Sequence, residues 1–343
     1  MNIYDIAQKA GVSVATVSRV LNKSQNVSEE TRKKVLSVIE GSNFVPNSVA
    51  RSLSKGSSRN IGFLVPDIEN PFFGAILHGI SDYAYTTGHN VFMFGTNEDE
   101  QREWEVLNAI QPAMIRGLIA IPVSENCPRN TQKLKQLQSQ NIPVVLIDRD
   151  IAGGGFDGVF SEDEEGARMA TQALIDAGHT RIATLCGPGN TRPGRERLQG
   201  YLTCLEENGL EMPEGYVQCG YFSEEQSYKA MHTLMQQDPL PTAVLSASNM
   251  TTLGIMKYLK ERNLQLGKDL AVIGFDDIKE LEFTNITLSV VVRPVYQMGR
   301  LVMELLQQIF EEEDGGSHIV RRYSVKTELI LRGSEKLYLG ESK

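Results

Sequence analysis

The chain has 343 residues, of which 41% are hydrophobic, and a formal net charge of −9. This length predicts two or three domains, each with a core of useful size. Its apolar runs are too short for a membrane-spanning helix, which needs about 20 residues. Its first residues lack the basic start and apolar stretch of a signal peptide, so we expect a cytoplasmic protein.

Four cysteines are scattered along the chain, and neither they nor the five histidines show the close spacing of metal ligands. We therefore expect buried free thiols in a reducing compartment, with no metal and no cofactor. The cysteines are Cys127, Cys186, Cys204 and Cys219.

Charge is divided unevenly between the start of the chain and the rest. Residues 1–60 contain nine basic and four acidic residues, a net charge of +5, which leaves −9 − 5 = −14 for the remainder. A basic segment on an acidic protein is typical of a segment that binds a polyanion. A solvated basic face is the plainer interpretation, so the residue pattern has to decide between them.

The pattern of residues 3–39 predicts three short helices. The first begins near Tyr4 and ends at Gly11, and the second follows Ser13, a suitable N-cap. Two such helices joined through a glycine turn form a helix-turn-helix. A third helix starting at Ser28 would give the pair a packing partner. The residues expected to face inward on the second and third helices are Val17, Val20, Leu21, Val35, Leu36 and Ile39.

The outward face of the second helix carries small side chains and one arginine. Small apolar groups can contact a thymine methyl in the major groove, and arginine can bond guanine with two donors. A small three-helix domain that binds another protein would show a similar pattern. The outward residues are Val14, Ala15, Thr16, Ser18 and Arg19.

Residues 44–60, "FVPNSVARSLSKGSSRN", predict a marginal helix followed by a flexible joint. A helix over 48–55 has only two turns, which is too short to be stable alone in water. Val49, Ala50 and Leu53 would allow it to pair with a second copy, and Leu53 could wedge between base steps in the minor groove. A linker with residual helicity is the alternative.

"YDIAQKAGVSVATVSRVLN" followed by "NFVPNSVARSL" resembles the head and hinge of the LacI/GalR family of bacterial transcription regulators. The resemblance implies that Val14, Ala15, Thr16 and Arg19 face DNA bases and that Leu53 enters the minor groove. The full set of implied DNA-binding residues is Tyr4, Ser13, Val14, Ala15, Thr16, Ser18, Arg19, Asn22, Asn47, Ala50 and Leu53.

From residue 61 onward, short apolar runs alternate with segments of helical length. Such alternation predicts parallel sheets covered on both faces, and its restart near Thr180 predicts two similar doubly wound α/β subdomains. The expected strands are 61–65, 90–94, 117–121, 143–148, 181–187, 242–247, 270–277, 288–294 and 324–331. The expected domains are the head 1–46, the hinge 47–60, a first effector subdomain 61–160 and 293–322, and a second 161–292 and 323–343. The resemblance, which extends to periplasmic sugar-binding proteins, implies this crossing of the chain.

Polar and aromatic side chains follow several of these strands, where doubly wound sheets bind ligands. Phenylalanine rings can stack on a sugar ring, while carboxylates accept from hydroxyl groups and guanidinium groups donate. Each residue alone is more simply explained by a core or a solvated surface. The segments concerned are "PDIENPFF", "IDRD", "GRERLQGY" and "GFDD". The glycine-rich "CGPGNTRPG" lacks the ending of a nucleotide-binding loop, so we interpret it as a turn before a helix.

"NPFF", "DR", "RERLQGY" and "GFD" resemble the pocket of ribose-type periplasmic binding proteins. This resemblance implies that Phe72, Phe73, Asp148, Arg149, Arg197 and Asp276 contact the ligand. The related pockets have an Asn-Asp pair where this chain has Ser248 and Asn249, and a glutamine where it has Arg293. The additional cation predicts an acidic ligand, so we expect a sugar or a sugar acid. The predicted effector site comprises these nine residues together with Asp67 and Asn70.

Together these features predict a ligand-responsive transcriptional regulator, most simply a repressor of a carbohydrate operon. A homodimer would bind double-stranded operator DNA, and the effector would act through the hinge. Control by a phosphocarrier protein or a purine corepressor is the alternative within the same fold. An enzyme with a DNA-binding head is disfavoured because we find no paired nucleophile and base and no cofactor loop.

Overall fold

The computed structural model describes residues 2–21, 26–42, 58–312 and 318–337. It divides into two compact units, which we call the head (residues 1–57) and the body (residues 58–343). The predicted hinge helix over 48–55 lies outside the described residues, as do the side chains of Asn22, Asn47, Ala50 and Leu53.

The described part of the head contains three helices, as predicted. They are α1 (Ile3–Ala10), α2 (Val14–Leu21) and α3 (Glu29–Glu40). Asn2 caps α1 by accepting hydrogen bonds from the backbone of Tyr4 and Asp5. Gly11 ends α1 with a φ of 64°, a left-handed conformation that glycine adopts without steric cost. Ser13 caps α2, since its hydroxyl accepts from the backbone N–H of Thr16 at 3.1 Å.

The three helices of the head pack around one small apolar core. Leu36 was expected to face inward, but it is 39% exposed, and Val38 packs against the core instead. The buried core residues are Ile6, Ala7, Ala10, Val17, Val20 and Val35.

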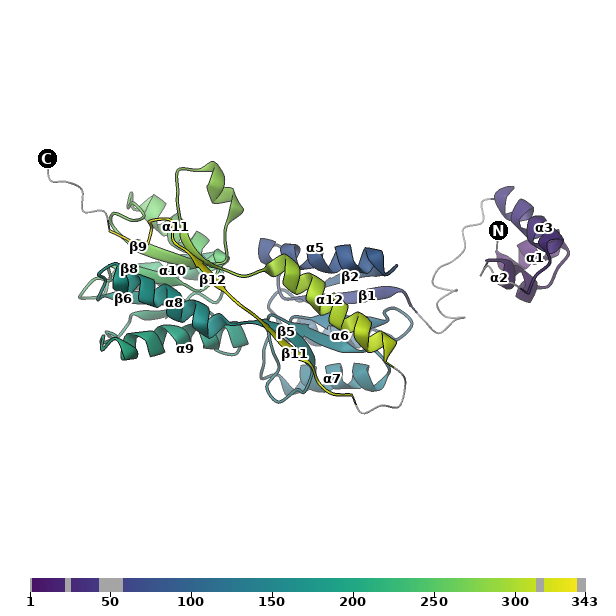
Figure 1. Ribbon diagram of the computed structural model, residues 1–343, viewed down its shortest axis with the longest axis horizontal. Coiled ribbons are helices and arrows are strands. Elements are labelled where there is room, and N and C mark those ends of the chain that lie inside the picture. The colour runs from purple at the N-terminus through teal and green to yellow at the C-terminus, as the bar shows by residue number, and fades with distance from the viewer. Residues whose placement is uncertain (1, 22–25, 43–57, 313–317, 338–343) are drawn as a thin grey trace. The chain divides into compact units, whose positions relative to one another are not determined.

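The body has two six-stranded sheets with helices on both faces, which confirms the predicted α/β architecture (Figure 1). The first sheet has the order β11-β5-β4-β3-β1-β2, and all its strands are parallel. Its strands are β1 (Asn60–Val65), β2 (Asn90–Gly95), β3 (Gly117–Ala120), β4 (Val144–Ile147), β5 (Asp157–Ser161) and β11 (Arg322–Val325). Its helices are α5 (Pro71–Thr86), α6 (Glu100–Ala109), α7 (Pro128–Ser139) and α12 (Val295–Glu311).

The second sheet has the order β12-β10-β9-β8-β6-β7 and is parallel except for its edge strand β12. Its strands are β6 (Ile182–Cys186), β7 (Val217–Cys219), β8 (Ala243–Ser246), β9 (Ala271–Phe275), β10 (Ser289–Val292) and β12 (Glu328–Ile330). Its helices are α8 (Asp163–Asp176), α9 (Arg192–Glu207), α10 (Glu224–Leu234) and α11 (Asn249–Glu261), with a short 3-10 helix, η1 (Lys279–Phe283).

Each sheet has an apolar core on both of its faces, which explains why its central strands read as continuous apolar runs. In the first sheet, α5 and α12 cover one face and α6 and α7 the other. In the second sheet, α8 and α9 cover one face and α10 and α11 the other.

The chain passes between the two sheets three times. It leaves the first sheet after β5 and returns to it after β10 through Arg293 and Pro294. The expected single strand over 324–331 is instead two strands, β11 in the first sheet and β12 in the second. The last passage therefore falls between Val325 and Glu328, a few residues after the expected boundary at 322.

Two strands were absent from the sequence expectations. β5 contains Gly158, and β7 has three half-buried residues, so neither gives a continuous apolar signal. No helix among the described residues is long and apolar enough to cross a membrane. The described part of the chain also has no cluster of side chains suited to holding a metal ion.

Candidate functional site

The predicted DNA-reading residues within the described head all keep access to solvent. Tyr4 is 69% exposed, and Ala15 and Arg19 are exposed on α2. Ser13 bonds the Thr16 hydroxyl at 2.9 Å as part of its cap, so both side chains help to begin α2. Val14, Thr16 and Ser18 are half-buried because they sit at the edge of the helix packing.

The body has a cleft of about 600 Å³ where the carboxyl ends of strands from both sheets meet. All eleven residues of the predicted effector site line it. Ten of them are buried and Asp67 is half-buried. The eleven are Asp67, Asn70, Phe72, Phe73, Asp148, Arg149, Arg197, Ser248, Asn249, Asp276 and Arg293.

Two helix N-termini supply part of the cleft wall. Asn70 caps α5 by accepting from the backbone N–H of Phe72 at 3.0 Å, and Ser248 caps α11. The Asn249 side chain donates to Asn70 Oδ1 at 2.8 Å, so the second subdomain contacts the first directly across the cleft.

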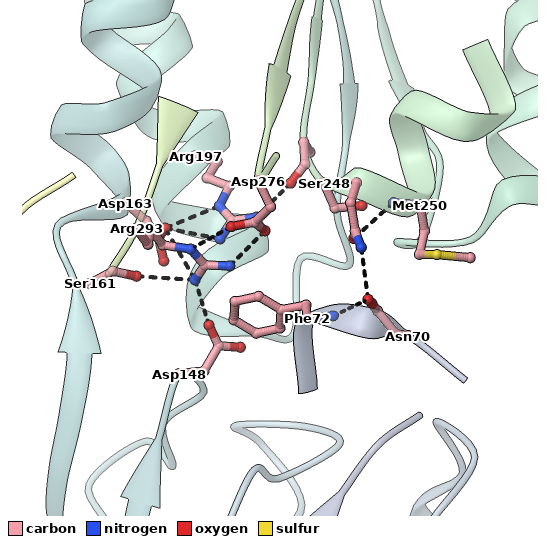
Figure 2. Close-up of polar contacts among 12 residues, drawn as sticks. Asn70, Phe72, Asp148, Ser161, Asp163, Arg197, Ser248, Met250, Asp276 and Arg293 are labelled. Carbon is pink, nitrogen blue, oxygen red and sulfur yellow. Dashed lines mark hydrogen bonds and ion pairs between the residues drawn. The ribbon is translucent and has the colours of Figure 1, made fainter. Parts of the chain in front are cut away.

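Arg293 lies between two carboxylates that come from different sheets. Its Nε and Nη2 donate to Asp276 at 2.9 and 2.7 Å, and its Nη1 donates to Asp148 at 2.6 Å (Figure 2). Nη1 also reaches the Ser161 hydroxyl at 3.2 Å. The guanidinium group lies 4.2 Å from the centre of the Phe72 ring. Arg293 therefore joins the two subdomains at the base of the cleft.

The other two arginines of the cleft are also paired. Arg197 donates from Nε and Nη2 to Asp163, and Arg149 donates to both carboxylate oxygens of Glu98 at 2.7 and 2.6 Å. The Arg149 Nε is buried and has no hydrogen-bond partner in the described structure, so a donor remains at that wall.

Burial and charge act in opposite directions on these groups. Burial raises the pKa of Asp148, and the nearby Arg293 charge only partly offsets this effect. Burial alone would lower the pKa of Arg293, but the charges of Asp276 and Asp148 outweigh it and raise the pKa. Arg293 is therefore held in its charged form.

Strained backbone is concentrated at the cleft. Among the described residues, eight non-glycine residues have positive φ, and six of these line the cleft. The other two, Asn141 and Asn263, follow the ends of helices. Such conformations persist where the surrounding structure enforces them, and they gather at ligand sites. The six are Asn97, Glu98, Asp148, Tyr221, Phe222 and Asp276.

Glu98, Tyr221 and Phe222 also line the cleft but were not among the predicted site residues. Tyr221 and Phe222 follow the unpredicted strand β7, so no strand end was assigned to them. Glu98 lies just beyond β2, and only its ion pair with Arg149 indicates that it belongs to the site. The aromatic pair in "GYFS" after "VQC" was the available signal.

Comparison with known proteins decides the family. The protein-family model described as "Bacterial regulatory proteins, lacI family" matches residues 2–47. A second family model, "Periplasmic binding protein-like domain", matches residues 171–335. The chain is 32% identical over 339 residues to the HTH-type transcriptional repressor PurR of Haemophilus influenzae, covering 98% of this chain and 99% of the relative. The chain belongs to the lacI family of bacterial regulatory proteins.

Solved structures of a repressor and of another transcriptional regulator share the fold of this lacI-family chain. A lac repressor dimer bound to operator and an anti-inducer has a TM-score of 0.80 at 25% identity, covering 98% of this chain and 99% of that one. A complex of the transcriptional regulator CelR with cellobiose has a TM-score of 0.72 at 27% identity, covering 97% and 99%. This lacI-family chain is thus a DNA-binding regulator with a ligand-binding body.

Proposed function

We propose that the chain is an effector-controlled repressor whose cleft binds an uncharged carbohydrate. As a homodimer, it would read operator DNA through α2 of each head. The convergence of eleven residues from separate strand ends on one cleft carries this proposal. The CelR structure supports a sugar effector, since that relative is solved with cellobiose.

The lining of the cleft matches the chemistry of a sugar ring. Phe72 and Phe222 offer aromatic faces to the C–H side of a ring, and Asn249 offers amide donors and acceptors. Asp276 and Asp148 offer carboxylate oxygens that hydroxyl groups can donate to. A polyhydroxylated ring uses both kinds of contact at once, whereas an apolar ligand would leave the buried polar groups without partners.

The charges of the cleft favour a neutral ligand over an acidic one. Seven carboxylates and three guanidinium groups line it, and each guanidinium is paired with a carboxylate. We expected Arg293 to bind an acidic group on the ligand, but its donors are directed to Asp148 and Asp276. An added anion would be repelled by these neighbours, so we propose a neutral sugar instead of a sugar acid.

Contacts across the cleft offer a way to connect ligand binding to the operator. Arg195 of α9 bonds both carboxylate oxygens of Glu125, which belongs to the first subdomain, at 3.2 Å. A sugar that bridges the same two walls would stabilise one arrangement of the subdomains over another. A coupling free energy of about 1–3 kcal/mol is sufficient to change operator affinity usefully.

A thermal-shift screen tests the proposal. Neutral sugars would be compared with the matching sugar acids and sugar phosphates, because specific binding raises the unfolding temperature. We expect at least one neutral sugar to stabilise the protein and to change its affinity for an operator selected from random DNA. Stabilisation by acids alone would contradict the neutral assignment. The proposal of a sugar effector would be contradicted if no sugar, but a purine or a phosphocarrier protein, changed operator affinity.

A further inference from the structure

Cys186 and Cys219 are direct partners on two neighbouring parallel strands. Cys186 ends β6 and Cys219 ends β7, and their Cα atoms are paired in the sheet register. Paired residues of a parallel ladder point to the same face, and neighbouring strands lie about 4.8 Å apart. A disulfide accepts Cα separations of roughly 4.4–6.8 Å, so these two free thiols are placed to form one without unravelling either strand.

The surroundings give the two sulfur atoms different roles. Cys219 is half-buried and its thiol donates to the Gly187 carbonyl at 3.3 Å, while Cys186 is only 8% exposed. The hydrogen bond with Cys186 lowers the pKa of Cys219 to about 7. The same contact, together with burial, raises the pKa of Cys186. Cys219 is thus the less buried residue of the pair and the more readily ionised one, and Cys186 is the neighbouring thiol.

We propose that Cys186 and Cys219 form a reversible disulfide when a hydroperoxide oxidises the protein. With hydrogen peroxide, the ionised Cys219 sulfur attacks one peroxide oxygen, the O–O bond breaks, and the departing hydroxide takes up a proton, which leaves a sulfenic acid and one water. The Cys186 sulfur then displaces the hydroxyl from Cys219 sulfur, and its proton leaves with that hydroxyl as a second water. The two thiols supply the two electrons that reduce the peroxide.

The bond would act on the wall of the effector cleft. Gly187 follows Cys186, and a Cβ built on Gly187 would lie 2.2 Å from the ring of Phe222. The Phe222 ring therefore packs against the Gly187 backbone, and the carbonyl of Gly187 accepts the hydrogen bond from the Cys219 thiol. Disulfide formation removes the thiol hydrogen and so breaks this hydrogen bond. It also links the ends of β6 and β7, which lead into the cleft wall at Phe222. This consequence depends on the proposed effector site, whereas formation of the disulfide does not.

The experiment uses reduced full-length protein treated with hydrogen peroxide, followed by alkylation and peptide mapping. We expect two of the four thiols to be lost, with one linked peptide that joins Cys186 to Cys219 and is cleaved by dithiothreitol. Cys127 and Cys204 should stay reduced as internal controls. The Cys204→Ser variant should still form the link, and Cys219→Ser should not. If the serine variant fails to fold, Cys219→Ala serves the same purpose.

Two results would overturn the proposal. One is retention of all four thiols at a peroxide dose that fully oxidises free glutathione. The other is oxidation of Cys219 alone, without a link to Cys186. Hydrogen exchange at residues 220–223 should slow at least threefold in the oxidised form, and unchanged exchange would refute the effect on the wall. The outcome of the sugar screen does not affect the number of thiols lost on oxidation. Failure of the proposed sugar effector can therefore be distinguished from failure of the proposed disulfide.

Discussion

Arg293 holds the carboxylate of Asp276 with two donors, Nε at 2.9 Å and Nη2 at 2.7 Å. Both side chains are buried, and the same guanidinium bonds Asp148 of the other sheet. Removing the cation would leave two buried carboxylates without their shared partner. Breaking such a pair costs more than the pair contributes, because the remaining charge stays out of water.

The variant Arg293→Gln should therefore lower the free energy of unfolding by about 3 kcal/mol at neutral pH. Urea unfolding measures this change. Arg195→Gln is a matched control, because the Arg195 side chain is 54% exposed and its pair should contribute about 1 kcal/mol or less. Equal losses in the two variants would contradict the larger contribution that we assign to the buried pairs of Arg293.

Phe222 should be needed for sugar binding. Phe222→Ala removes the ring and with it one stacking surface, and we expect the affinity for the sugar found in the screen to fall about tenfold. Calorimetry measures the affinity. Phe283→Ala is the control, since Phe283 is 90% exposed and does not line the cleft. Unchanged affinity in Phe222→Ala would place the ligand elsewhere.

Glu103 should make stability depend on pH. Burial raises the pKa of this carboxyl to about 7, despite hydrogen bonds from Asn130 and Val123 that favour the charged form. Because the folded pKa exceeds the unfolded value of about 4.3, the group stabilises the fold at low pH and loses this contribution as pH rises through 7.

The variant Glu103→Gln should consequently gain stability relative to the original chain between pH 5 and 8, as measured by urea unfolding at both values. Glu105→Gln on the same helix is exposed and should show little such change. A difference between Glu103→Gln and the original chain that stays constant with pH would argue against a raised pKa.

Arg19 should contribute to base recognition by α2. Arg19→Ala should weaken binding to the selected operator by about 1–3 kcal/mol, with a smaller effect on unrelated DNA. Fluorescence anisotropy at fixed salt measures both affinities. Lys33→Ala, an exposed residue of α3, is the control and should affect both DNAs alike. Equal losses for Arg19→Ala on both DNAs would assign Arg19 to the phosphates.

Much of the fold could be predicted because burial on both faces makes parallel strands apolar throughout. β1, β3, β4, β8 and β9 gave this signal, and residues that follow β1, β4, β8 and β9 line the cleft. β7 could not be predicted, since its three residues are half-buried at the sheet edge. Phe222 was therefore not predicted as a site residue either, because its place after a strand could not be recognised without the strand.

The pairing of the charges could not be predicted either. Asp148, Asp276 and Arg293 are far apart in the sequence, and only the fold shows that one guanidinium bonds both carboxylates. An unpaired arginine in the cleft would have favoured an acid. The paired arginine favours the neutral sugar that we propose, and Arg293 lines the cleft where its place after a strand predicted it.

The three passages between the sheets also bear on how the protein is made. Edge strand β11 of the first sheet and edge strand β12 of the second both lie within residues 322–330. A ribosome delivers these segments after every other described strand of the two sheets has emerged. Neither sheet can be completed before then, so the nascent protein should stay open to chaperones until residue 330 has been synthesised.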